Sequence, residues 1–129
     1  MAIVKYVTDL SMDAACEYVK NNATEMYICS GSSNPASRAA AISAALASKT
    51  GLTSGSFTGP ADGTVSGRKI TKNAESAVSI TANGDATCVV LCSASAIISV
   101  NAMTLQNLTS GGTVNVPAFI VTEIRDVTP

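Results

Sequence analysis

The chain has 129 residues, of which 47% are hydrophobic and only 13% are charged, and its net charge is −1. This balance predicts a single folded domain with its own core and excludes a disordered chain. The near-zero net charge removes the electrostatic case for nucleic acid or an anionic membrane as a partner. Because the chain contains no histidine, Ser-His-Asp and Cys-His catalysis and imidazole-bearing zinc sites are excluded as well.

A helix is predicted over residues 11–22, where Ser11 is a good N-cap and Lys20 suits the last turn. Apolar residues recur at helical spacing along this segment, at Met12, Ala15, Cys16 and Val19. The short apolar run at residues 26–29 then predicts a strand. The chain is therefore expected to begin with one helix that packs through a single face.

The alanine-rich residues 36–48 favour a second helix, with Asn34 as its cap and Pro35 in its first turn. Small residues mixed with serine also suit an extended arm, and this alternative stays open. Glycine, serine and threonine dominate residues 50–67, which predicts a long loop. Such a loop serves either as an arm that contacts a partner or as an Ω-loop that packs on its own domain through Phe57.

Strands are predicted from Gly67 onwards, because the hydrophobic period changes to two. In residues 77–82, Ser79 and Thr81 alternate with apolar residues, as expected for a half-buried strand. The Asn83-Gly84 pair that follows predicts a tight hairpin. It would lead into a central strand at residues 86–92, which are mostly apolar.

Further strands are predicted at residues 97–100 and 113–121, and Pro117 makes the latter an edge or bulged strand. The fold class is therefore mainly β (α+β), as an antiparallel β-sandwich or barrel-like meander with one or two helices before it. We expect a single domain, with a helical and loop part at residues 1–66 and a β meander at residues 67–125.

The cysteines predict buried, reduced thiols that act as small hydrophobic residues, since Cys88 and Cys92 lie inside an apolar run. The spacing of the four cysteines lacks the paired knuckles of a zinc site. No acid-base pair, phosphate-binding loop or secretion signal is recognisable. We therefore expect no cofactor, no metal and no catalytic residue, and a protein that is made in a cytoplasm and is not an enzyme.

The stretch from Ser76 to Thr122 carries a single charged residue, Asp85. An uncharged polar surface loses little hydration energy when a neighbouring chain covers it, so this stretch suits extensive protein contacts. The candidate contact residues are Ser79 and Thr81 on its polar face, together with Phe57 in the loop. The basic cluster Arg68, Lys69 and Lys72 is either a solvated strand face or a contact for an acidic protein partner.

Several segments of the chain resemble a family of small structural proteins encoded among the head genes of tailed bacteriophages. The segments that carry the resemblance are Met12–Ala15, Tyr18–Thr24, Ala47–Thr50, Phe57–Gly63, Ser66–Lys69, Leu108–Gly111 and Val114–Ala118. The resemblance implies a virion component with no catalytic or cofactor-binding residue to transfer. This chain departs from the family in residues 36–47, which are richer in alanine.

Our first hypothesis is a capsid cement or decoration protein that stabilises the head by contacting the major capsid protein and its own copies. It would act as a homo-oligomer, a trimer or a ring, because repetition multiplies weak contacts. A collar, connector or tail component is the alternative within the virion. A small cytosolic ligand-binding domain or enzyme is the alternative from another class, and it would need a concave pocket with convergent polar groups.

The thiol interpretation gives a first prediction. Residues four apart on an extended strand lie roughly 13 Å apart, whereas a disulfide needs Cα atoms within about 7 Å. Cys88 and Cys92 are therefore unable to pair with each other. Thiol titration of the denatured protein without reductant should return all four thiols, and a count of two or none would overturn the interpretation.

Overall fold

The computed structural model describes residues 8–125, which form two α-helices, one 3-10 turn and nine strands. In chain order these are α1 (Asp9–Asn22), β1 (Glu25–Cys29), α2 (Arg38–Ala44), β2 (Ala45–Thr50), η1 (Ser54–Ser56), β3 (Phe57–Asp62), β4 (Arg68–Lys72), β5 (Glu75–Ser79), β6 (Gly84–Cys92), β7 (Ile97–Leu108), β8 (Thr113–Val116) and β9 (Phe119–Ile124). The strands form antiparallel sheets of four (β2-β1-β6-β7), three (β3-β4-β9) and two strands (β5-β8). The predicted mainly β, α+β class is confirmed.

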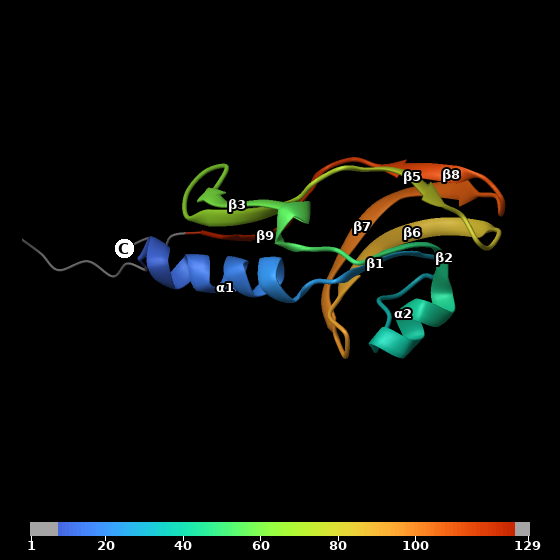
Figure 1. The fold of residues 1–129 in the computed structure, drawn as a ribbon, viewed down its shortest axis with the longest axis horizontal. Helices are drawn as coiled ribbons and strands as arrows, with labels where there is room; N and C mark the ends of the chain where they lie inside the picture. The colour runs from blue at the N-terminus through green and yellow to red at the C-terminus, as the bar shows by residue number, and fades with distance from the viewer. Residues whose placement is uncertain (1–7, 126–129) are drawn as a thin grey trace, which may run out of the picture.

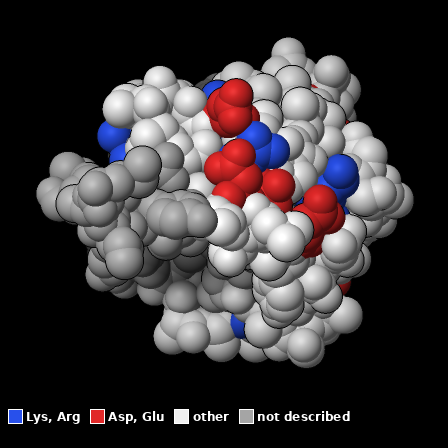
Figure 2. All heavy atoms as spheres, turned by 90° about the vertical axis from the view of Figure 1, so that its left-hand side faces the viewer, with Lys and Arg blue, Asp and Glu red and all other residues white. Residues whose placement is uncertain are grey.

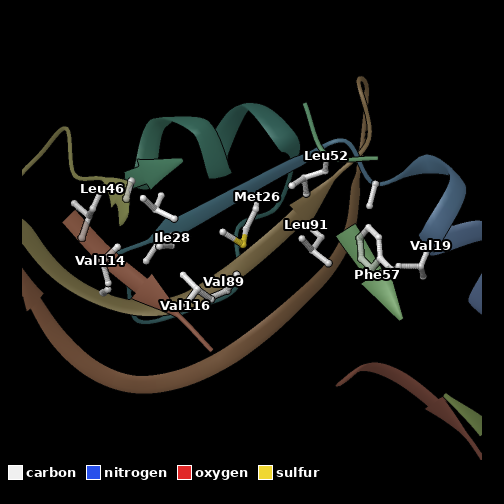
Figure 3. Packing of buried hydrophobic residues seen from close by; sticks show 14 of the residues in the cluster. Val19, Met26, Ile28, Leu46, Leu52, Phe57, Val89, Leu91, Val114 and Val116 are labelled. Atoms are coloured by element: carbon white, nitrogen blue, oxygen red, sulfur yellow. The ribbon is translucent and has the colours of Figure 1, made fainter. Parts of the chain in front are cut away.

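The four-stranded sheet is covered on both faces (Figure 1). One face packs Met26, Ile28 and Leu91 against the β5-β8 pair, which contributes Val114 and Val116; Figure 3 shows this cluster from close by. The opposite face carries a smaller cluster that packs against Ala41 of α2 and contains Tyr27, Cys29, Cys88, Val90 and Cys92. The central strand predicted at residues 86–92 is confirmed, since β6 lies between β1 and β7.

Helix α1 packs on the three-stranded sheet, beside β3 and β4 (Figure 1). Its buried residues Met12, Cys16 and Val19 lie on one face, as the helical spacing predicts. The predicted start at residue 11 was wrong, because the helix begins at Asp9. Thr8 is the N-cap, and its hydroxyl accepts a hydrogen bond from the Ser11 backbone N–H at 3.3 Å.

The second helix is shorter than residues 36–48, and the prediction of Asn34 as its cap was wrong. Helix α2 begins after the N-cap Ser37, and the chain turns into β2 at Ala45. Pairing of β2 with β1 buries Leu46 and Ala47. The tertiary gain from this burial outweighs the high helix propensity of alanine, which amounts to less than about 1 kcal/mol per residue.

The predicted loop at residues 50–67 also contains regular structure. The turn η1 and strand β3 occupy much of it, and β3 forms a hairpin with β4. Phe57 at the start of β3 is only 5% exposed and belongs to the main core. The segment therefore packs on its own domain through Phe57, and the structure does not show a free contact arm.

The predicted meander and its hairpin at Asn83-Gly84 were wrong. Strand β5 pairs with β8, and β6 pairs with β1 and β7, so the chain passes from one sheet to another at this point. The Asn83 side chain accepts a hydrogen bond from the Ser110 backbone N–H at 2.7 Å instead of closing a hairpin. Pro117 ends β8, which splits the strand predicted at residues 113–121 into β8 and β9.

Gly67, at the end of the turn between β3 and β4, allows β9 to approach closely. Its φ of +74° is unfavourable for other residues, and a Cβ there would overlap the Ile124 carbonyl oxygen. Gly51 has nearly the same φ, +71°, but open space around it. A substitution at Gly51 would therefore cause backbone strain alone, whereas a substitution at Gly67 would add steric overlap with β9.

We predict that Gly51→Ala lowers the free energy of unfolding by about 1–2 kcal/mol, the usual penalty of a left-handed backbone. Gly67→Ala should lower it by about 1–3 kcal/mol more, because the backbone of β9 has to move. Urea unfolding followed by circular dichroism measures both variants. Equal losses would show that the β4–β9 approach at Gly67 is not tight.

Candidate protein-contact surface

Most charged residues of the described part lie on α1 and on the three-stranded sheet, while Glu25 of β1, Arg38 of α2 and Lys49 of β2 lie with the four-stranded sheet. Figure 2 faces the α1 end of the molecule and shows acidic and basic side chains side by side. Strands β6, β7 and β8 together carry only Asp85, whose carboxylate accepts a hydrogen bond from the Asn107 side chain. The described part thus has a charge-rich half, on α1 and the three-stranded sheet, and an almost uncharged surface on β6, β7 and β8, here called the uncharged half.

The basic cluster predicted from the sequence is not a free patch, because its members point in different directions along β4. Arg68 donates from Nε to Asp13 on α1 at 2.7 Å and from Nη1 to Asp62 on β3 at 2.8 Å. These ion pairs raise the pKa of Arg68, the bond to Asp13 first. Arg68 therefore joins α1 to the sheet and is not free for an acidic partner.

Lys72 is fully buried, with an exposed fraction of 0%. Its Nζ donates to the Glu75 carboxylate at 3.0 Å and to the Asn73 carbonyl at 2.7 Å, and it lies 6.0 Å from the centre of the Phe57 ring. Lys72 and Phe57 were both named as contact candidates, and this was wrong, since both side chains belong to the interior. A buried ammonium group is costly unless it is paired and hydrogen-bonded. The Glu75 carboxylate and the Asn73 carbonyl supply these partners.

Lys69 is half-buried on the opposite side of β4, opposite Glu123 of β9. The Thr64 backbone N–H and hydroxyl, with smaller effects of Arg125 and Lys69, hold the pKa of Glu123 below its usual value. Lys69 therefore also contributes to an internal charge arrangement. The structure does not assemble the three basic residues into one site.

The remaining candidates, Ser79 and Thr81, are exposed on the uncharged half. Their neighbours Val78 and Ile80 are buried, as the alternation predicts. The Thr81 backbone N–H donates to the Leu46 carbonyl at 2.8 Å, which fixes this stretch against β2. These two side chains are thus presented on a rigid backbone.

Sequence reasoning missed the outer edge of β7, which ends the four-stranded sheet. From Ser99 to Ala102 the strand pairs regularly with β6, and the register shifts on both sides of this stretch. No strand among residues 8–125 pairs with its other edge. Proteins usually guard such an edge with charge or proline, and β7 contains neither and leaves Leu105 60% exposed.

A groove of about 370 Å³ lies between β7 and the segment from β8 to Phe119. Its lining is mostly apolar, with the amide side chains of Asn101, Gln106 and Asn115, and none of the described residues that line it is charged. Two of these amides already have internal partners: Asn101 donates to the Ile120 carbonyl, and Asn115 accepts from the Ala77 N–H. The groove therefore offers mostly apolar surface to a ligand, with few hydrogen-bonding side chains that lack an internal partner.

The strongly perturbed titratable groups lie on the other face of the sheet, beneath α2. Burial and a hydrogen bond to Glu25 raise the pKa of Tyr27 to about 12. The bidentate bond from Arg38, at 2.8 and 2.9 Å, lowers the pKa of Glu25 despite its partial burial. This network fastens α2 to β1 and does not face the groove.

Residues 8–125 show neither a metal-binding cluster nor a membrane-spanning helix. No group of three or more cysteine, aspartate or glutamate side chains is placed to hold a metal ion. None of the helices in the described part is long and apolar enough to cross a membrane. Comparison of the chain with protein-family models, curated proteins and solved structures gives no match.

We predict that Lys72→Met destabilises the protein by about 1–3 kcal/mol, because it leaves the Glu75 carboxylate without its buried partner. Lys69→Met, on the same strand but half-buried, should change stability much less. Adding Glu75→Gln to Lys72→Met should restore part of the loss. Thermal unfolding of the four proteins measures this, and equal effects at residues 69 and 72 would contradict it.

Proposed function

We propose that this protein is a structural component of a bacteriophage virion, specifically a capsid cement or decoration protein. It would bind the major capsid protein and neighbouring copies of itself. The observation that carries the proposal is the uncharged half, formed by β6, β7, β8 and the Ser79–Thr81 stretch. The resemblance of the sequence to small head-gene proteins of tailed bacteriophages points to the same class.

Covering the uncharged half with a neighbouring chain costs little hydration energy. Serine, threonine and asparagine side chains lose less hydration energy than ions when a neighbour covers them. The free edge of β7 offers backbone N–H and carbonyl groups in a row, which an extended segment of another chain can pair with. A large static interface of this kind needs no charge complementarity.

Repetition is part of the proposal. Each contact of this kind is weak alone, and a trimer or ring that engages several shell positions at once gains affinity by avidity. A collar, connector or tail component is the alternative within the virion, and it would show the symmetry of a single ring. Electron microscopy of particles that carry the protein separates the two.

The test is cosedimentation of the protein with empty shells of the major capsid protein. We expect Ser79→Lys, Thr81→Lys and Leu105→Lys to abolish shell binding while circular dichroism stays unchanged, because each would bury an ammonium group in the interface. The matched control is Asn21→Lys, which adds the same charge at an exposed position on α1. Normal binding by all three variants would show that the uncharged half is not the interface.

Salt gives a second arm of the same experiment. At about 1 M NaCl the Debye length is near 3 Å, so contacts held by exposed ion pairs weaken strongly. We expect the protein to stay on the shells under these conditions. Its release would show that charge holds it and would contradict the proposal.

A second candidate function, binding of a small neutral apolar molecule, is favoured by the groove of about 370 Å³. Its volume lies within the usual range for ligand pockets. Fluorescence titration with N-phenyl-1-naphthylamine, a neutral probe, tests it. Saturable binding that Thr104→Trp removes, by placing a large side chain in the groove, would support this function.

A further inference from the structure

Two of the four cysteines face each other across the central sheet. Strands β1 and β6 are antiparallel, and their register places Cys29 directly opposite Cys88. Both side chains belong to the cluster beneath α2, so they lie on the same face of the sheet. Directly opposed residues in antiparallel strands have Cα atoms about 4.5–5.5 Å apart, which is inside the range of about 4.4–6.8 Å that a disulfide spans.

The two thiols differ in access. Cys29 is fully buried, and its Sγ donates to the Ala41 carbonyl of α2 at 3.3 Å. Cys88 is 8% exposed and lines a cavity of about 190 Å³ between the Gly31–Asn34 segment and β7. Cys29 does not line this cavity, so a small reagent that enters it meets Cys88 alone.

The reactivity of the pair follows the same order. Burial raises the pKa of Cys29 to about 12, and the neighbouring Cys88 and Cys92 sulfurs add to the effect. Burial also raises the pKa of Cys88, but its polar contacts with the Thr87 and Cys29 side chains partly offset this effect. Both thiols are therefore less ionised than an exposed cysteine, and oxidation begins at Cys88 because that thiol is the more accessible and its pKa is the less shifted of the two.

We propose that Cys29 and Cys88 form an oxidation site that closes into an intramolecular disulfide when a peroxide or a small disulfide reaches Cys88. With hydrogen peroxide, the Cys88 thiolate takes one oxygen and becomes a sulfenic acid, and water leaves. The Cys29 sulfur then attacks the Cys88 sulfur, and a second water leaves. Two thiols are oxidised by two electrons in total, and one peroxide is reduced to two waters. With glutathione disulfide, the Cys88 thiolate forms a mixed disulfide and releases one glutathione, and the Cys29 sulfur then displaces the second glutathione.

The other two cysteines lack this geometry. Cys92 lies on β6 opposite Glu25, four residues and roughly 13 Å along the strand from Cys88. Cys16 lies on α1 in the other hydrophobic cluster. The proposal therefore names one pair, and it is independent of the virion function. It also agrees with the free thiols of the structure, since all four cysteines are unpaired there.

Closing the disulfide changes what holds α2 in place. The Cys29 thiol proton is lost, so the Ala41 carbonyl loses its donor. The Arg38–Glu25 ion pair and the bond from the Ser30 N–H to the Ala44 carbonyl remain. At the same time a covalent link joins β1 to β6, which are far apart in sequence, and such links stabilise the folded state.

The test uses the double variant Cys16→Ala/Cys92→Ala, which keeps only the proposed pair. The folded variant is incubated with hydrogen peroxide and separately with glutathione disulfide, then denatured and titrated for thiols. We expect the count to fall from two to none, with a mass loss of about two hydrogens and a higher urea midpoint than the reduced form. Adding Cys88→Ala should leave one thiol that resists both reagents.

Peptide mapping of the unmodified protein gives a readout that does not depend on the variants folding. After oxidation and alkylation, trypsin should release the peptide that contains Cys29 linked to the peptide that contains Cys88, and chymotryptic cleavage after Leu91 should leave Cys92 alkylated. A disulfide that includes Cys16 or Cys92, an intermolecular disulfide, or a stable sulfenic or sulfinic Cys88 with free Cys29 would overturn the proposal.

Discussion

The burial of β6 on both of its faces is the constraint that organises the rest of the structure. The strand lies between β1 and β7, and its residues from Cys88 to Cys92 are all buried. A strand of this kind needs cover on two sides. Helix α2 supplies it on one face and the β5-β8 pair supplies it on the other. The unusual chain path, which leaves the sheet after β2 and returns at β6, follows from this need for two covers.

The same arrangement separates charge from uncharged surface. The half built on β3, β4 and β9 is held by ion pairs, with Arg68 between Asp13 and Asp62 and Lys72 beside Glu75. The half built on β6 and β7 is held mainly by apolar packing, with the Arg38–Glu25 ion pair between α2 and β1. Charge has a structural use in the first half, and its near-absence from the second leaves a surface that other chains can cover at little cost in hydration. This division supports an assembly role and also explains why the basic residues do not form a binding patch.

Local patterns in the sequence predicted the elements that local physics determines. Helix α1, strand β1 and the central strand β6 carry their periodicity within a dozen residues, and all three are present. Pairing between strands that are far apart in the chain leaves no such local pattern in the sequence. Ala45–Thr50 is a strand because β1 lies beside it, and Asn83-Gly84 fails to make a hairpin because Ser110 and β8 compete for its neighbours. The sequence wrongly predicted Phe57 and Lys72 as contact residues for the same reason. Only the packing of distant segments shows that both side chains face inward.

The order of the strands along the chain has a consequence for synthesis. Strand β1 leaves the ribosome well before its partner β6, and β5 leaves it before its partner β8. Folds dominated by such distant pairings form slowly, because the chain loses the entropy of closing long loops before the paired strands stabilise it. The open edge of β7 is completed only with the last third of the chain. A nascent chain that still lacks β6 to β9 therefore has neither the uncharged half nor a partner for β5, and its sheets stay incomplete until these strands are made.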